Sequence, residues 1–423
     1  MIKFLFKGLM RDKSRSLIPI IVVAMGVIMT VFLQSLLSGV IGDSIESTAN
    51  FTTGHVKVMT RPYSENSSQL PNDLALVGVD TLKASLQKQF PEMTWAERIQ
   101  FGGLLDAPDS NGHTRSQGNV SGMGIRLLNS TEEITRMNLG PTLVSGKFPS
   151  KQGDMLLSDE LCRKMKLKLG DKVTLISSGM YGDMAMYNFT VSGTLHFGIT
   201  MLDRGLMIAD IEDVRSALNM ENASGEILGF FTNARYENKL AKEAAKSFNA
   251  QYVSSQDKFA PVMVPLSDMN DMGFLVAYSE NVQGIIVTIF IIAMAIVLWN
   301  AGLLGGLRRY GEFGLRLAIG ESKHEVYLTI VAESLLIGIV GSVIGVIVGL
   351  LISWYMQTVG WDISSMMKDS NFLMPSVMRA HITKTTYYIG FVPGIFSTVI
   401  GAMLAGIGIY KRQTANLFKE LDS

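Results

Sequence analysis

The sequence predicts an α-helical membrane protein with four transmembrane helices and a large α+β domain outside the cytoplasm. Of its 423 residues, 48% are apolar and only 17% are charged, and the mean hydropathy is positive. This composition is too apolar for an ordinary soluble protein and too polar for a chain that lies entirely within a membrane. One long apolar run lies near the N-terminus and three lie after residue 281, with a mixed, more polar stretch between them.

Each apolar run reaches the ~20 residues that a helix needs to cross a bilayer. The four spans are expected at Leu17–Ile41, Val282–Leu307, Val326–Met356 and Tyr387–Tyr410. Basic residues precede the first span, separate the second from the third and follow the fourth. With an even number of spans, all three basic clusters fall on one side, as the positive-inside rule requires. We therefore expect both termini in the cytoplasm, and residues 42–281 and the short loop 357–386 outside it.

Residues 1–16 are expected to form a helix in the cytoplasmic interface of the membrane. Ile2, Leu5 and Phe6 share one helical face, while Lys3 and Lys7 share another. The alternative is a basic flank without helical structure. The apolar run that follows is too long for the core of a secretory signal and has no clear cleavage site, so we expect it to stay as an anchor.

Residues 308–325 are short, charged and joined directly to the third span. Glu312, Arg316 and a short helix over Glu321–Glu325 give this segment its charge, and that helix includes Ser322, Lys323 and His324. Such a segment is less typical of a passive loop than of a helix held against the membrane. We expect it to be a place where a partner chain pushes on the membrane helices.

Small residues recur every four positions in the third and fourth spans: Gly341, Gly345 and Gly349, then Ser397, Gly401 and Ala405. Small residues at this spacing let helix backbones approach closely. We expect these faces to pack against helices of this chain or of a second subunit. The alternative is that the glycines are merely tolerated in a membrane helix.

The external stretch alternates strand and helix patterns, which predicts an α+β fold. Strands are expected at His55–Met59, Lys172–Ile176, Phe189–Leu195 and Leu206–Ile208, and helices at Val79–Gln89, Ser158–Leu167, Ile211–Asn219 and Glu237–Ala250. Ser158 is a good N-cap for its helix. Loops are expected at Arg61–Asp73, Ala107–Gly124 and Ser177–Tyr187.

The last of these loops is rich in methionine and tyrosine. Its large apolar side chains are Met180, Tyr181, Met184, Met186 and Tyr187. Flexible methionines suit an adaptable contact surface for a partner protein. The alternative is a hairpin tip that folds back on its own domain.

Motifs for catalysis are missing from the sequence. There is no GxxxxGK[ST] phosphate loop, no HExxH, no CxxC and no GxSxG. The five histidines are scattered, and Cys162 is the single cysteine. Lys plus Arg equal Asp plus Glu at 37 each, which gives no charge argument for nucleic acid. We expect no catalytic site, metal site or bound cofactor on this chain, so energy for any transport must come from another chain.

Four motifs resemble the permease subunits of the FtsX/MacB superfamily of ABC transporters, the type VII or mechanotransmission class. They read EFGLRLAIGESKHEV, AESLLIGIVGSVIGVIVG, SGKFPSKQGDMLLSDELCRKMKLKLGDKVTL and IYKRQTANLFKEL, the last without the family's usual proline. The size of the chain and the missing ATPase place it nearest the lipoprotein-releasing permeases LolC and LolE.

The resemblance implies a location in the bacterial inner membrane and a MacB-like periplasmic domain with core, porter and Sabre subdomains. It implies a pair of permeases, identical or paralogous, with a dimer of ATPase subunits that hold ATP and Mg. Segment 308–325 would be the ATPase contact. Residues Ser177–Tyr187 fall where LolC recruits its periplasmic chaperone, although this loop has no proline.

The function implied is the release of lipoproteins from the inner membrane without passage through the spans. Two alternatives stay open. One is efflux of a small molecule or peptide with a periplasmic adaptor. The other is a signalling scaffold that transports nothing and controls an external enzyme.

Overall fold

The structure is a computed structural model that describes residues 13–109, 112–128, 130–198, 200–232, 235–253, 255–269, 272–308, 315–362 and 377–411. It divides into two units. The helical unit contains the described residues up to Ile41, from Ala277 to Asp362 and from Val377 onward; the sheet unit contains Gly42–Val276. Of the expected interfacial helix, residues 1–12 lie outside the described part, and Lys13 is already the first residue of α2.

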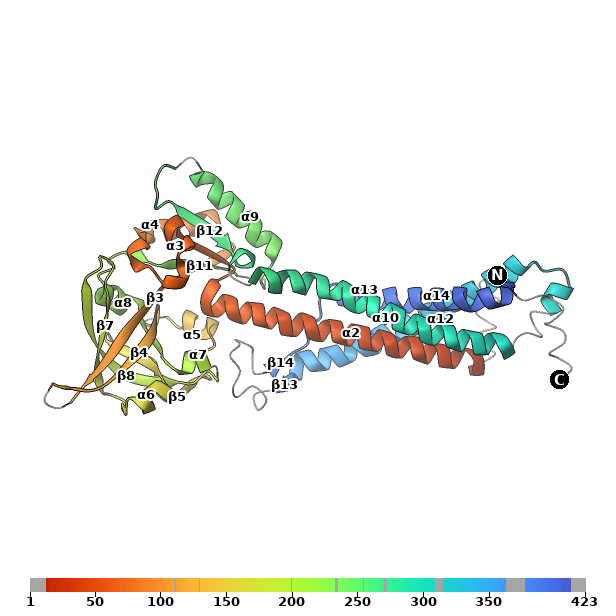
Figure 1. Ribbon diagram of the computed structural model, residues 1–423, viewed down its shortest axis with the longest axis horizontal. Coiled ribbons are helices and arrows are strands. Elements are labelled where there is room, and N and C mark those ends of the chain that lie inside the picture. The colour runs from red at the N-terminus through yellow and green to blue at the C-terminus, as the bar shows by residue number, and fades with distance from the viewer. Residues whose placement is uncertain are drawn as a thin grey trace. The chain divides into compact units, whose positions relative to one another are not determined.

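The long helices are α2 (Lys13–Thr48), α10 (Met272–Arg308), α12 (Lys323–Val359) and α14 (Phe391–Lys411), with the short α13 (Thr386–Ile389) before α14 (Figure 1). A π-helix, Ala49–Thr53, follows α2 directly. Strands β13 (Trp361–Asp362) and β14 (Val377–Met378) pair between α12 and α13.

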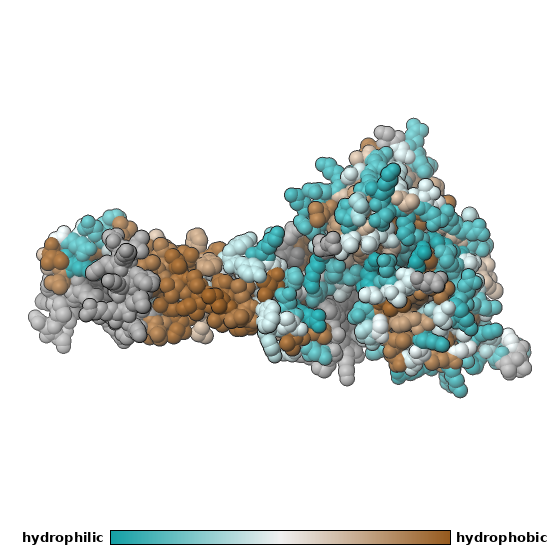
Figure 2. Space-filling model, turned by 180° about the vertical axis from the view of Figure 1, so that it is seen from behind, coloured by the Kyte–Doolittle hydropathy of each residue, from teal (hydrophilic) through white to brown (hydrophobic). Residues whose placement is uncertain are grey.

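Among the described residues, three helical stretches are long and apolar enough to cross a membrane: Leu17–Thr53, Lys323–Val359 and Thr386–Gly406. A shorter apolar stretch, Gly284–Asn300, lies within α10. Figure 2 shows a band of hydrophobic residues around the middle of the helices, with hydrophilic residues toward their ends. The number of four spans therefore stays a prediction.

The sheet unit is built on a mixed ten-stranded sheet in the order β12-β1-β11-β3-β4-β9-β6-β8-β5, with β7 paired to β3 and β8. Its strands are β1 (Val56–Thr60), β3 (Met93–Pro108), β4 (Thr114–Ile125), β5 (Leu143–Gly146), β6 (Asp154–Ser158), β7 (Lys172–Ser178), β8 (Met184–Leu195), β9 (Leu206–Asp210), β11 (Glu226–Phe231) and β12 (Pro261–Pro265). A separate pair joins β2 (Leu76–Val77) to β10 (Ala223–Ser224).

Short helices lie between these strands. They are α3 (Arg61–Glu65), α4 (Val79–Gln89), α5 (Glu132–Arg136), α6 (Asp159–Lys164), α7 (Thr200–Asp203), α8 (Ile211–Leu218) and α9 (Asn238–Asn249). Helix α4 has the predicted bounds. The hydroxyl of Ser158 accepts a hydrogen bond from the Leu161 amide, so Ser158 is the predicted N-cap of α6.

Strand β3 belongs to two hydrophobic cores. Its first half pairs with β11 and contributes Trp95 to a first core, which also contains Val58, Leu86 and Phe248. Its second half pairs with β4 and β7 and contributes to a second core, whose members include Phe101, Leu105, Leu161, Leu175 and Phe189. Because this one strand contributes residues to both cores, β3 links them covalently.

All three predicted loops were wrong in extent. Most of Ala107–Gly124 is strand β4, which pairs with β3 on one side and with β9 on the other. Ladder hydrogen bonds on both edges stabilise this glycine-rich strand despite its low intrinsic propensity. The Ser177–Tyr187 loop shrinks to residues 179–183, because β7 and β8 extend into it. Residues 61–65 of the first predicted loop form α3.

Candidate functional site

The predicted coupling segment is described from residue 315 onward, and Glu312 lies outside the described residues. Residues 315–318 form one helical turn, which ends at Gly320 with a positive φ of 97°. The Glu321 amide donates to the Arg316 carbonyl at 3.1 Å. The predicted short helix over Glu321–Glu325 is wrong. Glu321 precedes the helix, Ser322 is its N-cap, and residues 323–325 are the first turn of α12.

A capping box fixes the start of α12. The Ser322 hydroxyl accepts from the Glu325 amide at 3.2 Å, and a Glu325 carboxylate oxygen accepts from the Ser322 amide at 2.9 Å. Two backbone donors that the first turn would otherwise leave unpaired are satisfied in this way. The helix then runs without a break to Val359. The junction between the predicted coupling segment and the predicted third span is therefore a helix terminus with a defined geometry.

Replacing Ser322 with alanine should loosen this terminus. Loss of an N-cap costs about 1 kcal/mol, so amides of the first turn of α12 should exchange with deuterium about fivefold faster. Hydrogen exchange followed by mass spectrometry measures the rate. Ser322→Thr keeps the hydroxyl and should retain the slow exchange. Equal exchange in Ser322→Ala and the wild type would show that the box does not hold the terminus.

The same end of the helical unit exposes apolar side chains beside its charges. Leu315 and Ile319 are 64% and 76% exposed, and Leu328 in the second turn of α12 is 48% exposed. His324 and Glu325 are exposed as well. Mixed apolar and charged surfaces of this kind are typical of protein contacts. Sequence reasoning overlooked Leu315 and Ile319 because it followed the charges alone.

The glycines of α12 form a groove that a row of valines on α2 fills. A Cβ atom added to Gly341, Gly345 or Gly349 would lie 2.8, 2.6 and 2.9 Å from the Cβ atoms of Val23, Val27 and Val31, respectively. All three valines are fully buried. The two helices therefore touch along matched four-residue repeats, within one chain. The valine repeat was visible in the sequence but was not recognised.

The second small-residue row, on α14, lies against other helices of the unit. A Cβ added to Gly401 would come within 3.0 Å of the Leu298 Cβ on α10 and 3.1 Å of the Trp299 amide nitrogen. Ser397 is fully buried, and Ala405 is 8% exposed. On the neighbouring face, a Cβ on Gly338 of α12 would meet Thr398 Oγ1 at 2.4 Å. Gly401 thus packs closely against α10, and the other two residues of the row are buried.

The methionine-rich hairpin is exposed only in part. Tyr181, Met184 and Met186 are 80%, 73% and 61% exposed, whereas Met180 is 8% exposed and belongs to the second core. Tyr187 packs against that core, and its hydroxyl lies 3.3 Å from an Asp213 carboxylate oxygen. Met180 and Tyr187 are therefore removed from the predicted contact surface, because they anchor the hairpin to its own domain.

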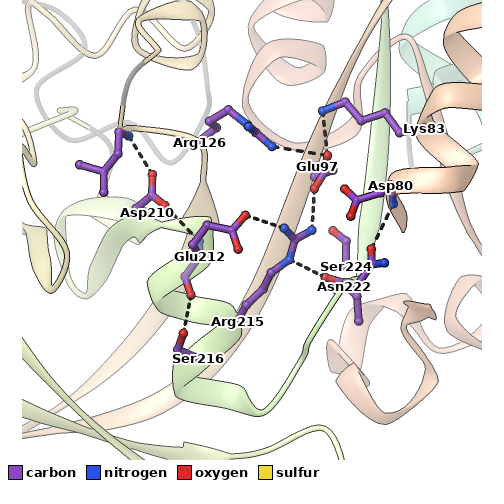
Figure 3. A network of polar contacts seen from close by, with 12 residues as sticks. Asp80, Lys83, Glu97, Arg126, Asp210, Glu212, Arg215, Ser216, Asn222 and Ser224 are labelled. Atoms are coloured by element: carbon purple, nitrogen blue, oxygen red, sulfur yellow. Dashed lines mark hydrogen bonds and ion pairs between the residues drawn. The ribbon is translucent and has the colours of Figure 1, made fainter. Parts of the chain in front are cut away.

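Glu97 on β3 is the centre of a buried polar network (Figure 3). Lys83 Nζ donates to one carboxylate oxygen at 2.7 Å, and Arg215 Nη2 donates to the other at 2.5 Å. Arg215 also donates to Glu212 and to the Ala223 carbonyl. Burial alone would raise the pKa of Glu97, but the hydrogen bonds and charges of Lys83 and Arg215 outweigh it and lower the pKa. The network ties α4, β3 and α8 together.

Replacing Glu97 with glutamine should cost about 3 kcal/mol of unfolding free energy, because it leaves Arg215 buried without its full counter-charge. The wild type should also lose stability as the pH falls from 4.5, the ordinary value, through the lowered pKa of folded Glu97. This acid-dependent part should be missing in Glu97→Gln. Thermal unfolding of the detergent-solubilised chain between pH 7 and pH 3 measures both effects.

Glu212→Gln is the matched control, because Glu212 also pairs with Arg215 but its side chain is 57% exposed. Its cost should stay below about 1 kcal/mol. Equal losses in the two variants would contradict the central position of Glu97.

Within the described part of the chain, no three His, Cys, Asp or Glu residues lie together as a metal site would need. Cys162 is a buried free thiol whose pKa is raised by burial. A small pocket of about 200 Å³ beside Glu97 is lined by Lys83, Trp95, Arg126 and Glu132, among others. The geometry thus offers a helix packing interface, a capped start of α12 and an exposed hairpin.

Comparisons with known proteins agree with a transport-related membrane protein. Residues 284–414 match the family described as FtsX-like permease C-terminal. The lipoprotein-releasing system transmembrane protein LolC of Xylella fastidiosa (strain 9a5c) is 24% identical over 211 residues, which are 49% of this chain and 49% of that protein. LolC of Neisseria meningitidis serogroup B (strain MC58) is 21% identical over 312 residues, 71% of this chain and 70% of that protein. The match thus spans about half the length of the Xylella relative.

Among solved structures, the periplasmic region of MacB from Actinobacillus actinomycetemcomitans aligns with a TM-score of 0.36 and 11% identity, over 55% of this chain and 96% of that one.

Proposed function

We propose that this chain belongs to the FtsX/MacB-like permease family and is the membrane subunit of an ABC transporter that releases lipoproteins from the bacterial inner membrane, as its similarity to the FtsX-like permease model and to LolC proteins supports. A separate ATPase dimer, holding ATP and Mg, supplies the energy. The observation that carries the proposal is the family match over residues 284–414. That range includes the capped junction and the glycine row of α12.

In the proposed arrangement, four helices cross the inner membrane, with α10 as the span after the sheet unit. Both termini and residues 308–325 face the cytoplasm, and the sheet unit is periplasmic with core, porter and Sabre subdomains. The basic clusters around the spans support this orientation. Exposed apolar residues of α12, including Ile344, Ile347 and Leu351, face lipid or a second permease, identical or paralogous.

ATP binding closes the ATPase pair, which presses on residues 308–325. Arg316, Glu321 and the first turn of α12 would be the charged contacts, and Leu315 and Ile319 would be buried by the ATPase. Because α12 starts directly after Ser322, a push at its end displaces the whole helix. Through the valine and glycine rows, α12 would carry α2 with it. This is a two-state element biased by binding at a distant site.

The substrate is proposed to be a lipoprotein taken from the outer leaflet of the inner membrane, because the curated relatives are named for lipoprotein release. Tyr181, Met184 and Met186 would contact a periplasmic chaperone. Isolation of the chain from native membranes, followed by mass spectrometry, tests this assignment. Co-purification of an ATPase with lipoproteins or their chaperone would support it. Recovery of an adaptor protein instead would favour efflux, and recovery of a cell-wall hydrolase would favour signalling.

A further inference from the structure

The π-helix that continues α2, Ala49–Thr53, is held by a buried arginine of the same sheet unit. The last residues of α2 and the π-helix after it, from Gly42 to Thr53, belong to that unit. Arg98 on β3 donates from Nη1 to the Phe51 carbonyl at 2.5 Å and from Nη2 to the Asn50 carbonyl at 2.6 Å. Arg98 is fully buried.

This contact satisfies groups that a helix end leaves open. The last carbonyls of a helix have no partner within it, and the helix dipole makes this end negative. A guanidinium group presents a rigid fork of donors that can bind two such oxygens at once. Arg98 therefore caps the end of the span with charge-assisted hydrogen bonds, which are stronger than neutral ones.

A second helix holds the guanidinium in place. Arg98 Nη2 lies 2.9 Å from a Glu133 carboxylate oxygen on α5, and Glu133 is 3% exposed. Glu133 is paired in turn with Arg136, whose guanidinium stacks over the Phe230 ring at 4.3 Å. The charge of Arg98 is thus balanced in the interior, and its orientation is fixed because Nε and Nη2 both donate to Glu133.

Side-chain pairs from residues that precede β1 and from the segment between β11 and α9 add to this attachment. Asp43 accepts from Arg235 at 2.9 Å. Glu46 lies 3.1 Å from His55 Nε2 and accepts from the Tyr236 amide at 3.2 Å. His55 Nδ1 accepts a hydrogen bond from the Phe231 amide at 3.1 Å. The ring proton is therefore on Nε2, which donates a hydrogen bond to Glu46. Unlike these pairs, the Arg98 contact is made to the backbone of the span itself.

Through its position in β3, Arg98 connects this contact to other elements of the sheet unit. Its neighbour Glu97 binds Lys83 of α4 and Arg215 of α8, and adjacent residues of a strand point to opposite faces. On one face of β3, Arg98 therefore binds the π-helix that continues α2. On the other face, Glu97 binds α4 and α8. It lies where β3 passes from the first core to the second.

We infer that Arg98 is a positioning residue that fixes the end of the first span to β3, so that a displacement of this span is passed to both cores of the sheet unit. This inference rests on the proposed function, because it assumes that the span moves in response to ATP.

Distances between spin labels in the full chain, reconstituted with its ATPase, test the inference. One label is placed at Ser47 near the end of α2 and the other at exposed Lys172 on β7, in a background in which buried Cys162 is alanine. In the wild type, the distance distribution should be narrow and identical with ADP and with ATP plus vanadate. In Arg98→Met it should broaden without nucleotide and shift with ATP plus vanadate.

Two further variants separate positioning from general destabilisation. Arg136→Met removes a cation from Glu133 without touching the helix end, and it should keep the narrow distribution. Arg98→Lys keeps the charge but loses the fork, and it should broaden the distribution in part. Labels at Lys172 and Lys239, both within the sheet unit, should report the same distance in all variants.

A wild-type distribution in both Arg98→Met and Arg98→Lys would overturn the inference. Broadening of the Lys172–Lys239 distance would overturn it as well, because Arg98 would then be a general core residue. Failure of the wild type to bind or stimulate the ATPase would count against the proposed function alone. The width of the Ser47–Lys172 distance distribution without nucleotide would still test whether Arg98 fixes the end of the helix.

Discussion

Replacing Gly345 with leucine should separate α2 from α12 and destabilise the helical unit. The added Cβ alone would lie 2.6 Å from the Val27 Cβ and 2.8 Å from the Ala24 carbonyl oxygen. The second contact is to backbone, so a change of rotamer cannot relieve it. Overpacking of this kind costs about 3 kcal/mol, and here it also removes a row of close helix contacts. The Tm of the detergent-solubilised chain should fall by several degrees.

Gly284→Leu is the matched control. Gly284 is also a helical glycine in an apolar stretch, and nothing lies within 4 Å of the Cβ that it would gain. This variant should have the Tm of the wild type or a slightly higher one, because leucine is the better helix former. If both variants had equal Tm values, the glycine row would not be a packing device, and the glycines would be merely tolerated.

Reversing the charges of the coupling segment should abolish stimulation of the ATPase. The ATPase surface is expected to carry charges opposite to those of Glu312 and Arg316. In the double variant Glu312→Arg with Arg316→Glu, each new charge would therefore meet a like charge on the ATPase. Like-charge contacts cost several kcal/mol at an interface, so stimulation should fall at least about tenfold. The permease should still insert in the membrane, because neither residue lies in a span. Stimulation is measured as phosphate release by the purified complex in nanodiscs.

The control reverses a pair of the same spacing in the sheet unit, Lys239→Glu with Glu243→Lys. Both residues are exposed on α9, and stimulation should be retained. Normal stimulation by the Glu312 and Arg316 variant would place the ATPase contact elsewhere on the chain.

Features set by local sequence were predictable. The bounds of α4 and the N-cap at Ser158 follow from nearest neighbours, and the glycine row of α12 follows from its period. The start of α12 could also have been found, because Ser322 and Glu325 have the spacing of a capping box. The predicted short helix over Glu321–Glu325 is wrong because this capping box starts α12 within the same residues.

Features set by distant partners were not predictable. Strand β1 pairs with β11 and β12, which follow it by more than 160 residues, and loop closure over such lengths leaves no local pattern. Strand β3 was missed because Glu97 and Arg98 interrupt its apolar character. Their partners Lys83, Arg215 and Glu133 come from three separate helices. The two buried charges are therefore compensated only once these helices have packed against the sheet, which no local pattern indicates.

The most direct measurement of the central claim is lipoprotein release from vesicles. The chain, its ATPase and any second permease are reconstituted with a purified lipoprotein, and a soluble lipoprotein chaperone is added outside, on the side of the sheet unit. ATP should transfer the lipoprotein to the soluble fraction, and a non-hydrolysable analogue should not. If ATP hydrolysis is stimulated while the lipoprotein stays in the vesicles under both conditions, the chain is not a lipoprotein-releasing permease.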